Sequence, residues 1–234
     1  MLNDAFEALK RHDWGTDLGL LAPIEAAVTA AHGNLAARED LEKLLLASLQ
    51  SNISLDAKDF VCRMLTQVGG AASAPVLGSL LGNEQQAHMA RYALERIPVP
   101  AAAQALRDAL PGLNGKLKIG VITSLGNRRD AAAVPALSAL LKDENTVVAR
   151  AAALALGSIG TAEAARTLQE FMPAADATKA AVVDAQFACA EALMADKKHQ
   201  AALGIYQSLA GDSQSRLARL AATRGMLNCA AKTA

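Results

Sequence analysis

The sequence predicts an all-α protein, a solenoid of about six to seven stacked pairs of helices. Two properties of the composition favour helices, because 52% of the 234 residues are hydrophobic and only 3% are aromatic. A core with few aromatic rings and much Ala and Leu suits the close packing of helix on helix. A third observation decides the architecture. A plan of two short helices recurs about every 31 residues, and a unit of that size buries its apolar surface only by stacking on its neighbours.

The repeat is visible in four segments that align without a gap. Each segment starts on a leucine near the end of one helix, passes through a short breaker and ends on a leucine in the next helix. The breakers contain Gly, Pro or polar residues, because Gly permits the positive φ of a helix C-cap and Pro cannot continue a helix. The four segments are Leu65–Leu77, Leu94–Leu106, Leu125–Leu137 and Leu156–Leu168.

The first helix of each repeat has an apolar face. Ala90, Leu94 and Ile97, for example, follow the i, i+4, i+7 spacing of one side of a helix. Residues 116–121 are the exception, because polar and apolar residues alternate there as in a strand and Gly120 disfavours a helix. The segment lies where the other copies have their first helix, so we predict a helix. We expect Gly120 to permit the close approach of a neighbouring helix.

The two ends of the chain depart from the regular period of residues 51–173. Residues 1–50 predict three helices, and residues 174–234 predict three more, the second of which is similar to the second helix of a tetratricopeptide repeat. We expect one solenoid domain over residues 1–234, with a last helix that needs a partner from a longer chain. The six helices are predicted at Asn3–Arg11, Asp17–Ala31, Ala36–Gln50, Lys179–Met194, Gln200–Leu209 and Arg216–Leu227.

The segment VPALSALLKDENTVVARAAALALGSIG, Val134–Gly160, resembles the HEAT-like repeat first named from phycobilisome lyases. That repeat joins a VPAL-xx-LL-xD helix to a V-R-xx-AAxALGxIG helix. The resemblance covers Leu65–Met172, and Phe60–Ile97 is also similar to HEAT-rich segments of large bacterial proteins. It implies a right-handed α-α superhelix whose usual role is protein binding. One position departs from the pattern, since Ala149 stands where the family has Arg and Arg150 follows one place late.

Charge and targeting signals argue against several classes of protein. Lys+Arg and Asp+Glu both total 23, so the formal net charge is zero, whereas proteins that bind nucleic acid non-specifically carry an excess of cations. Binding to a nucleic-acid backbone is therefore only a second alternative function. The N-terminus lacks the basic and apolar stretches of a signal peptide, and no apolar run is long enough to span a membrane. We expect a soluble protein, in a compartment that the sequence leaves open.

The sequence contains no constellation typical of catalysis, so we predict no catalytic residue, no metal site and no cofactor. HEAT-like hydroxylases hold iron with His-Glu pairs, but none of the four histidines is followed by Glu. The cysteines Cys62, Cys189 and Cys229 are far apart, and we expect buried thiols rather than disulfides or nucleophiles. A bilin-lyase-like enzyme or accessory, suggested only by the name of the repeat, is the first alternative function.

The single tryptophan lies in the sequence His12–Asp13–Trp14. An aspartate in this position favours a turn before a helix. We expect the indole of Trp14 to pack over the first helices, because a large ring usually buries most of its surface. The alternative is an exposed tip that binds a partner.

The best candidate binding surface is the polar side of the helix around residue 90. Tyr and Arg occur there, and both are frequent among the residues that dominate interface energies. In HEAT-like solenoids this helix lines the concave face. The alternative is a solvated face with an ion pair between Arg91 and Glu95, one turn apart. We predict a non-catalytic scaffold that binds a protein partner through His88, Arg91, Tyr92, Arg96 and, one repeat earlier, Arg63.

Overall fold

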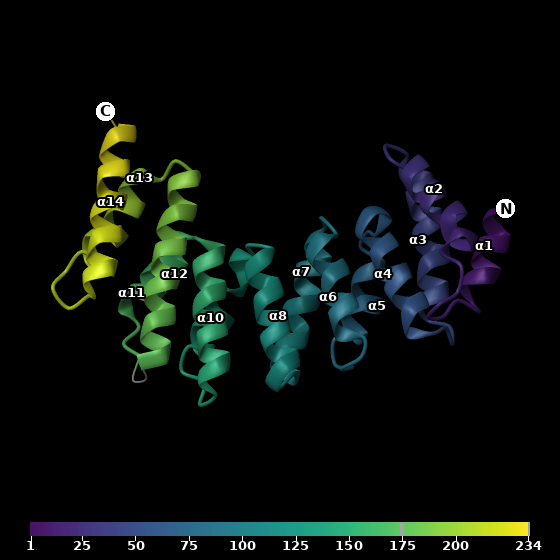
Figure 1. The fold of residues 1–234 in the computed structure, drawn as a ribbon, viewed down its shortest axis with the longest axis horizontal. Helices are drawn as coiled ribbons and strands as arrows, with labels where there is room; N and C mark the ends of the chain where they lie inside the picture. The colour runs from purple at the N-terminus through teal and green to yellow at the C-terminus, as the bar shows by residue number, and fades with distance from the viewer. Residues whose placement is uncertain (174–175, 234) are drawn as a thin grey trace. The chain divides into compact units, whose positions relative to one another are not determined.

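The computed structural model describes residues 1–173 and 176–233, which form helices joined by turns and short loops (Figure 1). Fourteen α-helices and three short 3-10 helices occur in these residues, and none of them belongs to a β-strand. The predicted all-α fold of six to seven helix pairs is therefore confirmed. Across the same residues, no helix is both long enough and apolar enough to cross a membrane.

The chain divides into two compact units, Met1–Ser124 and Leu125–Ala234. In the first unit, helices two places apart in the chain pack on each other, α4 against α6 and α5 against α7. This is the two-layer stacking that a repeat of helix pairs requires. The α-helices that begin in this unit are α1 (Leu2–Leu9), α2 (Ala22–Ala30), α3 (Leu35–Leu49), α4 (Leu55–Val68), α5 (Ser73–Ser79), α6 (Ala87–Arg96), α7 (Pro100–Ala109) and α8 (Gly115–Asn127), with 3-10 helices at Leu18–Leu21 and Leu110–Gly112.

The second unit repeats the same two layers. Here α10 packs against α12 in one layer, α9 against α11 in the other, and α14 packs chiefly on α13. The last turn of α8 belongs to this unit. A 3-10 helix at Ala131–Ala133 is followed by α9 (Val134–Leu140), α10 (Thr146–Ile159), α11 (Ala162–Glu170), α12 (Asp176–Ala195), α13 (His199–Leu209) and α14 (Arg216–Thr233). One continuous solenoid over both units stays a prediction.

The leucines that begin and end the four aligned segments lie in the cores of their units. Those at the starts of the segments lie on α4, α6, α8 and α10, and those at the ends lie on α5, α7, α9 and α11. Each of the eight is 0% exposed. The repeat register thus predicted correctly which side of each helix is buried: Leu65, Leu77, Leu94, Leu106, Leu125, Leu137, Leu156 and Leu168.

The helix boundaries follow the turn chemistry of the sequence, with one correction near the N-terminus. Gly160 ends α10 with a φ of 66°, and the hydroxyl of Thr161 caps α11 by accepting a 3.1 Å hydrogen bond from the amide of Ala164. Residues 116–121 lie inside α8, so the register was a better guide than the local alternation. The single helix predicted at Asp17–Ala31 is wrong. Asp17 instead accepts from the amide of Gly19 at 2.8 Å and starts a 3-10 helix before α2.

Candidate functional site on the polar side of α6

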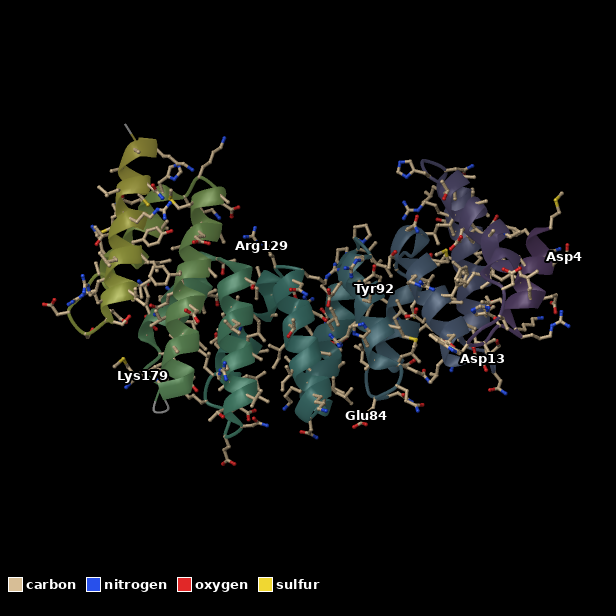
Figure 2. All side chains as sticks on the ribbon, viewed as in Figure 1. Asp4, Asp13, Glu84, Tyr92, Arg129 and Lys179 are labelled. Atoms are coloured by element: carbon tan, nitrogen blue, oxygen red, sulfur yellow. The ribbon has the colours of Figure 1, made fainter. Side chains whose placement is uncertain are left out.

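Tyr92 and Arg96 lie one turn apart on the exposed side of α6 and contact each other. The guanidinium carbon of Arg96 lies 3.7 Å from the centroid of the Tyr92 ring, and its Nη1 donates a 3.0 Å hydrogen bond to the carbonyl oxygen of Tyr92. Tyr92 is nevertheless 39% exposed (Figure 2). Stacking of a cation on an exposed ring contributes about 0.5–1 kcal/mol. The pair therefore presents an aromatic ring and a cation that are already held in position.

Two of the other predicted residues, His88 and Arg63, are exposed as well. His88 is exposed one turn before Tyr92 on the same helix. Arg63 is exposed on α4, which packs against α6, and occupies the register of Tyr92 one repeat earlier. Its Nε lies 3.3 Å from Asp59 Oδ2, and its guanidinium carbon lies 6.0 Å from the ring centroid of Phe60. The exposed sides of two adjacent helices thus carry these residues.

Arg91 has a different environment from the other four residues. It is half-buried, and its Nη1 donates a 3.2 Å hydrogen bond to the carbonyl oxygen of Gly120 on α8. A Cβ at Gly120 would lie 2.7 Å from the Arg91 guanidinium carbon, so the group that comes closest is this side chain and not, as its place in the sequence predicted, the backbone of a neighbouring helix. Ser124 on α8 donates a 2.6 Å hydrogen bond back to Glu95 on α6. Arg91 and Glu95 therefore join two neighbouring helices of the first unit.

Trp14 contradicts the expectation that its indole packs over the first helices, because it is 89% exposed. The turn itself forms as predicted, with the Trp14 amide donating a 2.9 Å hydrogen bond to Asp13 Oδ1. The neighbouring His12 is the ring that becomes buried, with its Nδ1 2.6 Å from Thr16 Oγ1. The turn therefore buries the His12 ring and leaves the Trp14 ring in solvent. The residue pattern of the sequence does not show which of the two rings is buried.

The three thiols are buried, as predicted. Burial raises the pKa of Cys62 to about 12 and the pKa of Cys189 to about 11, so the reactive thiolate is scarce at neutral pH. Burial also raises the pKa of Cys229, whose Sγ lies 3.2 Å from Met194 Sδ. Over residues 1–173 and 176–233, no three His, Cys, Asp or Glu side chains converge as metal ligands would.

Sequence reasoning missed a groove in the second unit, between α12 and α14. Phe187 of α12 and Leu217 of α14 both line it. They are thirty residues apart in the chain, and each is one apolar residue among many in its helix. The one available signal was the composition of the last helix, where leucines alternate with arginines instead of forming one apolar side.

Comparison with known proteins supports the repeat architecture. A family model described as HEAT repeats matches residues 104–185. HEAT-like repeats are thus shown over residues 104–185. The matched HEAT-like repeats include α8 to α11 and part of α12, in both units. No curated protein sequence matches the chain. Among solved structures, the crystal structure of an engineered protein from the Northeast Structural Genomics Consortium matches with a TM-score of 0.45 and 19% sequence identity, over 97% of this chain and 68% of that chain.

Proposed function

We propose that the chain is a non-catalytic scaffold that binds a protein partner through the Tyr92 face, defined as His88, Tyr92 and Arg96 of α6 with Arg63 of α4. The stacked Tyr92–Arg96 pair is the observation that carries this proposal. Side chains that are ordered before binding lose less conformational entropy when a partner is bound. Tyr and Arg are also the residue types that most often dominate the energy of an interface.

The wider context of the proposal comes from the repeat. HEAT-like solenoids commonly bind proteins over an extended surface, and the helices in the position of α4 and α6 line its concave face. We assign the Tyr92 face to that side, in a repeat of the phycobilisome-lyase type within a soluble, longer bacterial protein. Arg91 stays out of the interface, because its guanidinium is engaged with Gly120.

Site-specific photo-cross-linking in the cells that naturally produce the protein tests the Tyr92 face. We expect a photoreactive phenylalanine analogue in place of Tyr92 to give one discrete cross-linked product. Leu44 is the matched control position, because it is 44% exposed on α3, a helix that carries no residue of the Tyr92 face. The same analogue at Leu44 should give no such product.

Charge reversal then tests the arginines independently of the ring. Arg96→Glu and Arg63→Glu should each remove the cross-linked product while the far-UV circular dichroism stays unchanged, because both side chains are exposed. Identical products from positions 92 and 44, or products insensitive to both charge reversals, would show that this face does not bind a partner.

A further inference from the structure

A groove of about 490 Å³ runs between α12 and α14 in the second unit. Its apolar walls include Val183 and Phe187 from α12 and Leu217 and Ala221 from α14. A volume of this size falls in the range of sites that bind ligands, which are about 300–1,000 Å³ and mostly apolar. In Figure 1, α14 lies at the end of the second unit, next to α13.

Aromatic packing joins α12, α13 and α14 next to the groove. The ring of Phe187 lies 6.3 Å from the ring of Tyr206 on α13, centroid to centroid. Gly225 of α14 packs against the ring of the same tyrosine. A Cβ at position 225 would lie 2.6 Å from Tyr206 Cζ. Tyr206 therefore fills the space under the second half of α14. The groove lies beside the first half of the helix, where Leu217, Ala218 and Ala221 line it.

Leu217, which lines the groove, is a large apolar residue that is mostly exposed. Leu217 is 79% exposed, and Leu220, one turn further along α14, is 59% exposed. Ala218, on the inner side of the same turn, is buried. A contiguous apolar surface of this kind on a folded protein marks a place where another molecule packs. Leu217 and the walls of the groove together form such a surface.

One wall of the groove comes from a helix that is rich in cations, although only Lys179 and Asp184 are charged among the residues that line it. Helix α14 carries Arg216, Arg219, Arg224 and Lys232 and has no Asp or Glu between Arg216 and Thr233. Arg219 is paired with Asp212 at 3.1 Å. Arg216 and Arg224 are exposed, and neither forms an ion pair within the described residues.

The α12 side of the groove carries one charge of each sign, Lys179 (Figure 2) and Asp184. These two charges cancel, and Glu191 of α12 acts on Tyr206 under α14, so the cations of this region come from α14. Exposed Arg216 and Arg224 therefore supply the cations, from the helix that forms one wall of the groove.

We propose that this groove binds an amphipathic helix of a partner protein, one whose apolar stripe is flanked by Asp and Glu. An apolar groove accepts such a helix through residues at i, i+3, i+4 and i+7, and the arginines of α14 select its charge. A membrane surface fits less well, because a flat bilayer contacts exposed side chains such as Leu217 more readily than Phe187, which is half-buried in the lining. The site is independent of the Tyr92 face, which lies in the first unit.

Two synthetic peptides of about 18 residues test the proposal on the whole chain. Both carry the same leucine stripe, and the remaining positions are mostly Glu in one peptide and mostly Lys in the other. Fluorescence anisotropy of labelled peptides should give a Kd in the micromolar range for the Glu peptide and a Kd at least about tenfold higher for the Lys peptide. Because the two peptides share their leucine stripe, the difference in Kd measures the contribution of charge.

Variants on the surface of α14 locate the binding. Leu217→Asp should weaken binding of the Glu peptide by about tenfold or more. Leu227→Asp is the matched control, because Leu227 is 67% exposed on the same helix but does not line the groove, and its Kd should stay within about twofold of the unchanged protein. The double variant Arg216→Glu, Arg224→Glu should reverse the preference between the two peptides.

Several results would overturn the proposal. These are equal binding of the two peptides, no binding of either one, and equal effects of the Leu217 and Leu227 substitutions. Sedimentation with mixed vesicles of phosphatidylcholine and phosphatidylglycerol tests the membrane alternative. Vesicle binding that Leu217→Asp abolishes, without any peptide binding, would assign the surface to a membrane. All substituted side chains are exposed, and the preference of the unchanged protein for the Glu peptide is a test that needs no variant.

Discussion

Polar side chains join helices in both units, but the units differ in how closely the helix backbones approach each other. In the first unit, polar side chains reach from one helix to the backbone of the next. Glu42 of α3 is buried and accepts three hydrogen bonds at the start of α5, from the amides of Gly70 and Ser73 at 2.7 and 2.9 Å and from the Ser73 hydroxyl at 2.6 Å. Arg91 joins α6 to Gly120 of α8 in the same way.

The second unit has polar ties as well, since Arg129 Nε donates a 3.1 Å hydrogen bond to the carbonyl oxygen of Ser158 and Gln186 Nε2 donates a 2.8 Å bond to that of Leu168. Its small residues also let helix backbones approach each other directly. A Cβ at Gly157 of α10 would lie 2.6 Å from the carbonyl oxygen of Ala185 and 2.7 Å from its Cα on α12. A Cβ at Gly126, in the last turn of α8, would lie 2.9 Å from the Cα of Ala155 on α10. These contacts involve backbone atoms, which cannot rotate away as a side chain can.

The comparison shows that the spacing of a repeat does not determine which interactions hold neighbouring helices together. Hydrogen bonds between helices stabilise a unit only while each donor keeps its acceptor, because a buried donor without a partner costs about 1–3 kcal/mol. Close backbone packing has no such polar partners but tolerates no added volume. The two units should therefore be sensitive to different substitutions, and the following experiments test that difference.

Glu42→Ala should have the largest effect. It leaves the amides of Gly70 and Ser73 and the Ser73 hydroxyl without their acceptor, so we expect the free energy of unfolding to fall by about 3 kcal/mol. Glu42→Gln keeps one acceptor oxygen and should lose about half as much. Urea denaturation followed by circular dichroism measures both.

Glu39→Ala is the matched control for Glu42. Glu39 lies one turn earlier on α3 and is exposed, so its removal should change the free energy of unfolding by no more than about 0.5 kcal/mol. A similar loss for both variants would mean that the charge of α3, and not the tie to α5, stabilises the unit.

Gly157→Ala should have the next largest effect, a loss of about 1.5 kcal/mol in the free energy of unfolding. The added methyl group meets the backbone of Ala185, and overpacking of this kind costs about 1–3 kcal/mol. Alanine's better helix propensity offsets only about 1 kcal/mol of the cost. Urea denaturation of the single variant measures the difference.

The same substitution at two other glycines separates the backbone contact from the loss of glycine itself. At Gly120 the obstacle is the flexible guanidinium of Arg91, so Gly120→Ala should be nearly neutral. At Gly204 in α13 nothing lies within 4 Å of the added methyl group, so the protein should become more stable by about 1 kcal/mol. Equal effects at Gly157 and Gly120 would remove the distinction between the two units.

The helices and their buried sides were predictable from the sequence, because both depend on local spacing. Leu94 and its equivalents recur at fixed register, and their burial follows from helical geometry alone. The ties between helices were not predictable. Glu42 and Ser73 are 31 residues apart, and neither has a neighbour that distinguishes it from a surface residue.

The candidate sites also differ in how much of their structure the sequence predicts. Tyr92 was found because it is the one aromatic residue on the polar side of its helix, so its exposure followed from the helical pattern. The exposure of Trp14 and the groove beside Phe187 depend on how a turn and two separate helices meet. Such contacts are set by tertiary packing and leave no periodic signal in the chain.

Alkaline pH should have the smallest effect and should act on both units alike. Burial raises the pKa of Cys62 from 9.0 to about 12 and that of Cys189 from 9.0 to about 11. A raised pKa means that the folded state favours the protonated thiol. The resulting stability is complete below pH 9 and is lost as the pH rises toward the folded pKa, because only the unfolded chain releases the proton in that interval.

The stability lost by Cys62→Ala and by Cys189→Ala should therefore shrink as the pH rises from about 9 to about 10, by about 1 kcal/mol for each thiol. Urea denaturation at several pH values measures this change. Val61→Ala is the control, because Val61 is as buried as Cys62 on the same helix and has no proton to lose. The stability that Val61→Ala removes should be the same at every pH in this interval. If the losses at Cys62 and Cys189 were equally constant, burial of the thiols would not be coupled to their ionisation in either unit.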